Sequence, residues 1–186
     1  MTTRISIRPS LFSALLFVFA TPASGQMLSG TAGSTHTPTQ TDSIKTVDGF
    51  SGMVLVTPDT DWKSKWETPS NTVPAFNTVT TIQKGKQIFI LTLLGNPPQN
   101  DQGVAEVTCD IDILRPDGTP ALHQEDTPCL RGSVRTSPPQ LYLAAAVITF
   151  VGDPGDPTGK WTVRVALRDK VKNTVIPLRT SFVLQP

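Results

Sequence analysis

Apolar and polar residues alternate along several stretches of this chain, and the alternation is clearest over residues 104–114. Five apolar positions there point one way, and the intervening positions are polar. A period of two over ten residues predicts a half-buried β-strand, because successive side chains of a strand point to opposite faces. Similar alternation over residues 161–168 and 176–184 predicts two further strands.

Shorter apolar runs fill the remainder of the predicted domain, at residues 50–56, 78–82, 86–94 and 141–151. Pro- and Gly-rich turn signals separate them, and the chain holds 17 prolines and 13 glycines. No stretch keeps a helical period of 3.6 for long. These patterns predict an all-β, antiparallel, immunoglobulin-like β-sandwich of about seven strands over residues 49–186.

The immunoglobulin-like version is indicated by the approach to one alternating strand. Asp156, Gly159 and Trp161 resemble the D-x-G-x-Y entry to the penultimate strand of such domains, with Trp161 in the place of the tyrosine. Val163 stands where antibody domains carry a cysteine. We therefore expect the cysteines of this chain to join one strand to a neighbouring loop or edge strand, not one sheet to the other.

The N-terminus has the pattern of a secretory signal peptide. Arg4 and Arg8 precede a short apolar run at residues 11–20, and small residues follow at 23–25. The run is about half the roughly 20 residues that a membrane helix needs. We expect residues 1–25 to be removed, with cleavage after Gly25 or, alternatively, Ala23. Residues 26–48, rich in Thr, Ser and Gly, are expected to be a flexible tether.

Export changes the interpretation of the two cysteines and of the charge. In an oxidising compartment, Cys109 and Cys129 are expected to form one disulfide. Without Arg4 and Arg8, 14 basic residues face 15 acidic ones, a formal net charge of −1. Near-neutral charge without basic clusters argues against nucleic acid as a partner, and no later segment suggests membrane insertion. We expect a periplasmic or secreted monomer.

Candidate catalytic residues are few. His36 lies in the expected tether and His123 in a polar stretch, and neither has the spacing of a metal site. No constrained nucleophile motif is present. Asp110 and Asp112, with Glu106, lie on one face of a strand. They could serve a hydrolase acting on envelope polysaccharide or contribute to a calcium site, but a solvated polar face is the simpler interpretation. No metal, cofactor or catalytic residue is predicted.

The segment at residues 59–68 is unusual because it holds two tryptophans four residues apart. That spacing would place Trp62 and Trp66 on one side of a short helix, capped by Asp59 or Thr60. With Lys63, the tryptophans form our candidate contact surface for an envelope protein or glycan. The alternative is that the segment plugs one open end or edge of the sandwich.

Five motifs together resemble a group of uncharacterised exported bacterial proteins with an immunoglobulin-like β-sandwich. They are D-W-x-x-K-W-x-T-P (61–69), C-D-I-D-I (109–113), R-P-D-G (115–118), F-V-G-D (150–153) and D-P-x-G-x-W (156–161). The resemblance spans most of residues 50–186 and implies a bacterial source and an exported setting. It implies no activity and assigns no functional residue.

From the sequence we therefore expect an exported, non-enzymatic binding or accessory module of the bacterial envelope. Two alternatives remain open: a polysaccharide hydrolase that uses the strand carboxylates, and a structural subunit of the pilus type. A pilus-type subunit would lack one strand of its own and would accept it from a partner.

Overall fold

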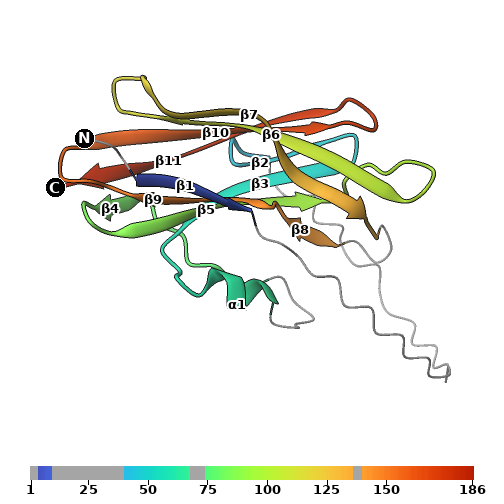
Figure 1. Ribbon diagram of the computed structural model, residues 1–186, viewed down its shortest axis with the longest axis horizontal. Coiled ribbons are helices and arrows are strands. Elements are labelled where there is room, and N and C mark those ends of the chain that lie inside the picture. The colour runs from blue at the N-terminus through green and yellow to red at the C-terminus, as the bar shows by residue number, and fades with distance from the viewer. Residues whose placement is uncertain (1–3, 10–39, 68–73, 136–139) are drawn as a thin grey trace.

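The computed structural model describes residues 4–9, 40–67, 74–135 and 140–186, with β1 (Arg4–Pro9) described as a strand only. The described chain is almost entirely β and is built from two sheets stacked face to face (Figure 1). This confirms the expected β-sandwich. The strands number eleven among the described residues, against the seven or so expected from the sequence.

Sheet A has six strands in the order β1-β9-β5-β3-β2, and β8 pairs with β5 beyond the start of β9. Its strands after β1 are β2 (Ile44–Val47), β3 (Phe50–Thr57), β5 (Gln87–Gly95), β8 (Leu141–Leu143) and β9 (Ala146–Val151). β5 lies at the centre, and seven of its nine residues are buried. The uninterrupted apolar run of β5 is thus explained by burial on both faces.

Sheet B has five strands in the order β4-β11-β10-β6-β7. They are β4 (Thr81–Gln83), β6 (Val104–Leu114), β7 (Pro120–Ser133), β10 (Gly159–Asp169) and β11 (Val175–Gln185). The expected bounds of β6 are confirmed. All pairs within this sheet are antiparallel except β4 with β11, which is parallel. The expectation of a wholly antiparallel sandwich is wrong at that edge.

Three stretches differ from the sequence expectation. The apolar run at 141–151 is divided between β8 and β9, because Ala144 and Ala145 form a break in which their N–H groups bond to Thr92 and Cys129. β7, the longest strand, was not predicted. β2 lies inside residues 26–48, so the expected tether ends before Ile44. Residues 26–39 lie outside the described part of the chain.

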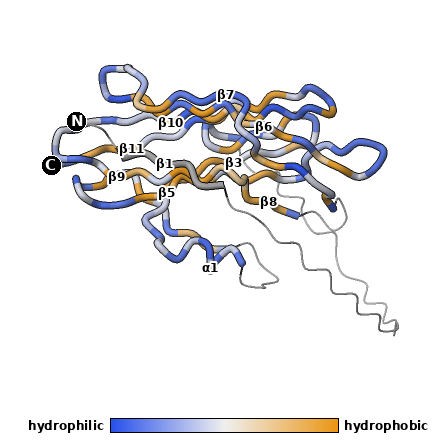
Figure 2. Tube along the Cα trace, viewed as in Figure 1, coloured by the Kyte–Doolittle hydropathy of each residue, from blue (hydrophilic) through white to orange (hydrophobic). Residues whose placement is uncertain are grey.

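The main core is formed by buried residues of both sheets. Hydrophobic stretches, in orange, run along strands of both sheets (Figure 2). The largest members of the core are aromatic. Phe150 meets Trp161 edge to face with ring centroids 5.0 Å apart, and it meets Phe182 in the same way at 4.8 Å. Trp161 also stacks on Phe182 at 6.2 Å. One strand of sheet A and two of sheet B therefore meet in a single aromatic cluster.

Trp161 anchors the turn that leads into β10. Its side chain is fully buried, and its indole N–H donates a 3.0 Å hydrogen bond to the carbonyl of Pro157, four residues upstream. A buried indole N–H needs such a partner. Within the same turn, the carboxylate of Asp156 accepts a 2.8 Å hydrogen bond from the backbone N–H of Asp153. These contacts fix the entry of the chain into β10.

The expected disulfide between Cys109 and Cys129 is present. It joins β6 to β7 within sheet B, with Cα atoms 5.8 Å apart, and both residues are buried. β7 is the edge strand of that sheet. The bridge therefore ties an edge strand to its neighbour, as the sequence indicated.

The N-terminal strand β1 is an edge strand of sheet A, next to β9. It pairs antiparallel with the whole of β9, from Arg4 opposite Val151 to Pro9 opposite Ala146. These residues belong to the segment expected to be removed as a signal peptide. Among the described residues, no helix is long and apolar enough to cross a membrane.

Candidate functional site

A row of charged residues crosses the outer face of sheet B. Arg179 on β11 lies directly opposite Arg164 on β10. Arg164 in turn lies opposite Asp112 on β6, and Asp112 lies opposite His123 on β7. The neighbours Val163 and Val165 are buried in the core, so Arg164 between them points outward. The alternation that builds the core also aligns these side chains on one surface.

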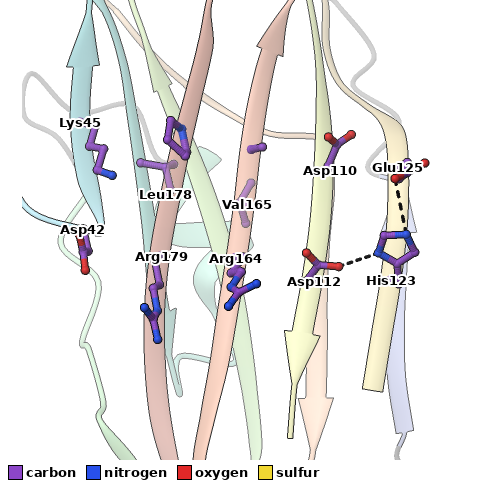
Figure 3. A pocket seen from close by; sticks show the side chains of 12 residues that line it. Asp42, Lys45, Asp110, Asp112, His123, Glu125, Arg164, Val165, Leu178 and Arg179 are labelled. Atoms are coloured by element: carbon purple, nitrogen blue, oxygen red, sulfur yellow. Dashed lines mark hydrogen bonds and ion pairs between the residues drawn. The ribbon is translucent and has the colours of Figure 1, made fainter. Parts of the chain in front are cut away.

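All four residues of this row line a groove of about 430 Å³, which we call the sheet-B groove (Figure 3). Its lining also includes Ala166 and Pro177, which are paired across β10 and β11. Their short side chains leave space between the long charged ones. The groove is lined by Asp42, Lys45, Asp110, Asp112, His123, Glu125, Arg164, Val165, Ala166, Pro177, Leu178 and Arg179.

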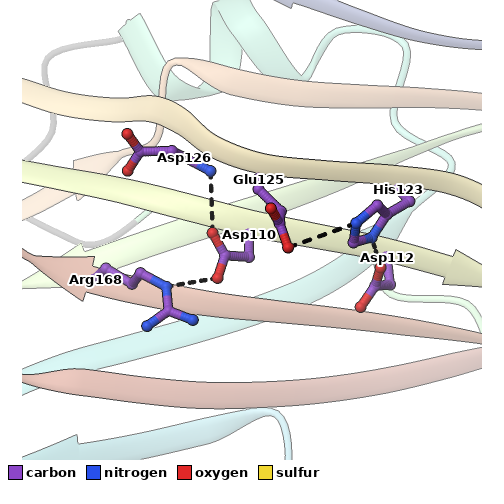
Figure 4. Close-up of polar contacts among 6 residues, drawn as sticks. All are labelled: Asp110, Asp112, His123, Glu125, Asp126 and Arg168. Carbon is purple, nitrogen blue, oxygen red and sulfur yellow. Dashed lines mark hydrogen bonds and ion pairs between the residues drawn. The ribbon is translucent and has the colours of Figure 1, made fainter.

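Asp110 and Asp112 of the groove already have hydrogen-bond or ion-pair partners within the chain. Asp110 accepts from the guanidinium of Arg168 at 2.5 Å and from the backbone N–H of Asp126 at 3.0 Å (Figure 4). Partial burial disfavours its charged form, but these two contacts outweigh burial and lower the pKa of Asp110. Asp126 in turn pairs with Lys170 at 2.6 Å. Asp110 is therefore held as an anion by contacts from β7 and β10.

His123 links two acids at the edge of the groove. Its Nδ1 lies 2.6 Å from an oxygen of Asp112, and its Nε2 lies 3.6 Å from an oxygen of Glu125. The hydrogen bond with Asp112 raises the pKa of His123, which favours the imidazolium form. The residue is exposed, as expected, but it is held by a specific partner.

The basic side of the groove is different. Among the described residues, neither Arg164 nor Arg179 forms an ion pair, although they are directly opposite each other on neighbouring strands. Figure 3 shows both side chains extending in the same direction. Like charges directly opposite in a sheet are destabilising. Lys45, from β2, lies on the same side of the groove.

The residues predicted for hydrolysis or metal binding are only partly brought together. Asp110 and Asp112 both line the groove, but Glu106 is not among the lining residues. Within the described ranges, no group of three or more His, Cys, Asp or Glu side chains is placed to hold a metal ion. His36 lies outside those ranges.

The tryptophan segment lies on the opposite side of the sandwich. It forms α1 (Trp62–Glu67), which packs on the outer face of sheet A (Figure 1). Trp62 lies 6.0 Å from Phe89 between ring centroids, and both tryptophans are half-buried against a second apolar cluster. Lys63 is exposed and lies 3.7 Å from Glu67. The helix thus covers an apolar sheet face with part of each indole while leaving the rest exposed.

Asp59 anchors this helix to the chain that follows it. Its carboxylate forms a 2.8 Å ion pair with Lys65 of the helix and accepts two hydrogen bonds from Asn77, at 2.9 and 2.8 Å. Burial opposes the ionisation of Asp59, but the bonds from Lys65 and Asn77 outweigh it and lower its pKa from 3.8 to about 2. The carboxylate therefore ties the helix to Asn77, on the segment that leads to β4, and does not act only at the start of the helix.

We expect Asp59→Asn to lower the free energy of unfolding at neutral pH by about 1–3 kcal/mol, because it weakens a buried charge-assisted network. The pKa of Asp59 is lower in the folded state than in the unfolded state, so its carboxylate stabilises the fold above pH 3.8. This contribution is lost as the pH falls toward 2. The difference between the variant and the wild type should therefore shrink over that window in urea titrations. Asp61→Asn is the control. Asp61 is exposed, so a change below about 0.5 kcal/mol is expected.

The sequence pointed to the acids of the groove but missed its arginines. Arg164 and Arg179 occupy outward positions of two predicted alternating strands, so their faces were predictable. Their adjacency was not, because it depends on the register between β10 and β11.

Comparison with known proteins gives no functional assignment. No family model matches the chain, and no curated protein matches it. Among solved structures, a family 123 glycoside hydrolase from Clostridium perfringens is similar, with 9% identity and a TM-score of 0.41 over 72% of this chain. The match spans only 27% of that hydrolase. A FixG-related protein from Vibrio parahaemolyticus has 12% identity and a TM-score of 0.40 over 75% of this chain and 100% of its own.

Proposed function

We propose that this protein is an exported, non-enzymatic binding module of the bacterial envelope with an immunoglobulin-like sandwich, and that the sheet-B groove is its ligand site. The observation that carries the proposal is the pair formed by Arg164 and Arg179, two cations that lie opposite each other without an ion pair among the described residues. An anionic ligand would neutralise both. Paired guanidiniums suit carboxylate or phosphate recognition because each offers a rigid fork of donors.

The other lining residues indicate a ligand that also carries hydroxyl groups. Asp112 and Glu125 supply carboxylate oxygens, which accept hydrogen bonds. Ala166 and Pro177 add apolar surface to the lining, on the same two strands as the arginines. A sugar unit with a carboxylate combines an oxyanion, hydroxyl donors and an apolar ring face. We therefore propose an acidic glycan, with a uronic acid as the recognised unit.

Binding is better supported than hydrolysis. A glycosidase needs one carboxylic acid with a raised pKa to protonate the leaving group. The pKa of Asp110 is instead lowered by Asp126 and Arg168, despite partial burial. Asp112 is hydrogen-bonded to His123 at 2.6 Å. Asp110 is thus held as an anion and is not organised as a proton donor.

The groove is favoured over the tryptophan helix as the contact surface. Trp62 and Trp66 cover apolar residues of sheet A, which gives them a packing role within the domain. Their exposed parts, with Lys63, remain the second candidate surface. A variant with both tryptophans replaced by alanine belongs in the same binding experiment.

The test is isothermal titration with an oligogalacturonide, compared with a neutral oligosaccharide of the same length and an oligoglutamate peptide. Binding of the oligogalacturonide alone is expected. Arg164→Gln and Arg179→Gln should each weaken it about tenfold or more, the loss of one charge-assisted contact. Lys160→Gln is the matched control, since Lys160 is an exposed cation on β10 outside the groove and should leave the affinity unchanged.

Contrary results separate the alternatives. Equal affinity for the neutral oligosaccharide would show that the arginine pair does not recognise a negative charge on the ligand. Preference for the oligoglutamate would identify a protein partner instead of a glycan. Loss of binding in Trp62→Ala/Trp66→Ala, with none in the arginine variants, would move the site to α1. Release of reducing ends by wild-type protein would contradict the non-enzymatic assignment.

A further inference from the structure

β9 has a neighbour on each side, and one of them is the N-terminal strand. β5 pairs with β9 from Gln87 opposite Val151 to Ile90 opposite Ile148. β1 pairs with the other edge of β9 over all six residues. In sheet order β1 is terminal, so it is the element that protects the β9 edge.

Without β1, that edge would be poorly protected. β9 reads AVITFV and contains no charge, proline or glycine. These are the features that natural edge strands avoid, because an apolar strand with unpaired N–H and C=O groups recruits other strands. Ile148 and Phe150 of β9 also belong to the main core and are almost fully buried. Removal of β1 would expose part of the core together with the backbone edge.

We propose that removal of the export segment opens β9 as an acceptor for an extended strand donated by a partner protein. This inference rests on the export and processing assumed in the proposed function, but it concerns a surface separate from the sheet-B groove. β1 belongs to residues 1–25, the segment predicted to be cleaved. In this view the export segment completes the sandwich of the precursor, and a partner strand replaces it in the processed protein.

The pairing of β1 defines the chemistry of the donated strand. It runs antiparallel to β9 and spans six residues without a bulge. Residues directly opposite in an antiparallel pair share a face of the sheet. Phe150 and Ile148 belong to the main core, so the positions opposite them call for apolar residues in a donated strand. In β1 they are Ile5 and Ile7. The intervening positions, opposite Thr149 and Val151, tolerate polar residues.

A single extended strand suits this edge better than a second copy of the domain. The backbone N–H of Ala145, just before β9, bonds to the carbonyl of Cys129 on β7 at 2.8 Å. The long edge strand of sheet B therefore lies beside the start of β9. An isolated strand needs only the backbone edge, whereas a whole sandwich would have to clear β7 as well.

The experiment uses protein recovered after export, with its N-terminus identified by mass spectrometry. The probe is a synthetic peptide, residues 4–9 with Ser6→Cys, carrying an activated thiol. Ser6 lies opposite Thr149, so the peptide should form a disulfide with a Thr149→Cys variant. Cα atoms of opposed antiparallel residues lie within disulfide range. Val183→Cys is the control, because Val183 is exposed on a strand of sheet B.

We expect capture by Thr149→Cys at least tenfold faster than by Val183→Cys. A peptide with Ile5 and Ile7 both replaced by lysine should lose this advantage. The unmodified protein provides a second measurement, fluorescence anisotropy with labelled wild-type peptide, which does not depend on the cysteine variants folding. Saturable binding of the wild-type peptide and not of the lysine peptide is expected.

Two results of the capture experiment, and one of the mass spectrum, would overturn the inference. One is equal capture by the two cysteine variants with no anisotropy change. The other is a processed dimer that cross-links through Thr149→Cys in both copies, which would make a second copy the occupant. Oligogalacturonide binding, measured on the same sample, reports the groove separately. A retained residue 4 in the mass spectrum would contradict processing itself, and with it the open edge.

Discussion

Replacing Trp161 with alanine should lower the free energy of unfolding by about 3–5 kcal/mol, the cost of removing a fully buried tryptophan. The side chain has no exposed surface and contacts Phe150 of sheet A and Phe182 of sheet B. The variant would also leave the Pro157 carbonyl without its indole donor. Because domains of this kind are stable by about 5–15 kcal/mol in total, the loss should be evident in urea unfolding.

Trp161→Phe separates packing from the corner hydrogen bond. It keeps an aromatic ring in the cluster but lacks the N–H that reaches Pro157. A smaller loss of about 1–3 kcal/mol is expected, from the lost hydrogen bond together with the smaller volume of the ring. If the alanine variant proves as stable as the phenylalanine variant, the aromatic cluster is not what joins the sheets at this corner.

The parts of the fold that the sequence predicted are those in which one face is buried and the other solvated. β6 and β10 have this pattern, and burial alternates along both. In such strands the polarity of each residue indicates which face it occupies, so the strand bounds can be predicted from the local sequence. The disulfide was predictable for a different reason: there are only two cysteines, and an oxidising compartment pairs them.

β7 could not be predicted because its pairing is irregular. Register shifts interrupt its ladder with β6 between Val107 and Thr108 and again between Cys109 and Ile111. Each bulge changes which face the next residue occupies, so a period of two does not survive in the sequence. As an edge strand, β7 also carries many exposed polar residues and resembles a loop.

The candidate site was half predictable. Acids on the outward face of β6 were identified from alternation, but their function depends on what the neighbouring strands place beside them. Arg168 neutralises Asp110, and His123 engages Asp112. Arg164 lies opposite Arg179 on one side and Asp112 on the other, and among the described residues it forms an ion pair with neither. Only the register between strands reveals which charges have a partner among the described residues and which do not.

The role of β1 shows a limit of another kind. The N-terminal residues carry the pattern of a cleaved signal, and that pattern says nothing of pairing with β9. A sandwich that is closed by its own N-terminal strand argues against a pilus-type subunit only if that strand stays. The expected cleavage makes the strand-accepting alternative testable on the processed protein.

Opening the Cys109–Cys129 disulfide should destabilise the protein by about 3 kcal/mol, because the bridge closes a loop of about 20 residues and restricts the unfolded chain. The sequence separation is 20, and both cysteines are buried between neighbouring strands. The bridge also secures β7, whose ladder with β6 is interrupted by bulges. Reduction should therefore lower the urea midpoint and release the edge of sheet B first.

Cys109→Ala/Cys129→Ala provides the matched comparison. The double variant should unfold at nearly the urea concentration of the reduced wild type, and reductant should not change it further. Hydrogen exchange of β7 amides should accelerate in both, ahead of β10 and β11, since local opening begins where the fewest contacts hold the backbone. A wild-type midpoint that is insensitive to complete reduction would mean that the loop is already restrained by the β6–β7 ladder. Export to an oxidising compartment would then matter for delivery of the protein and not for its stability.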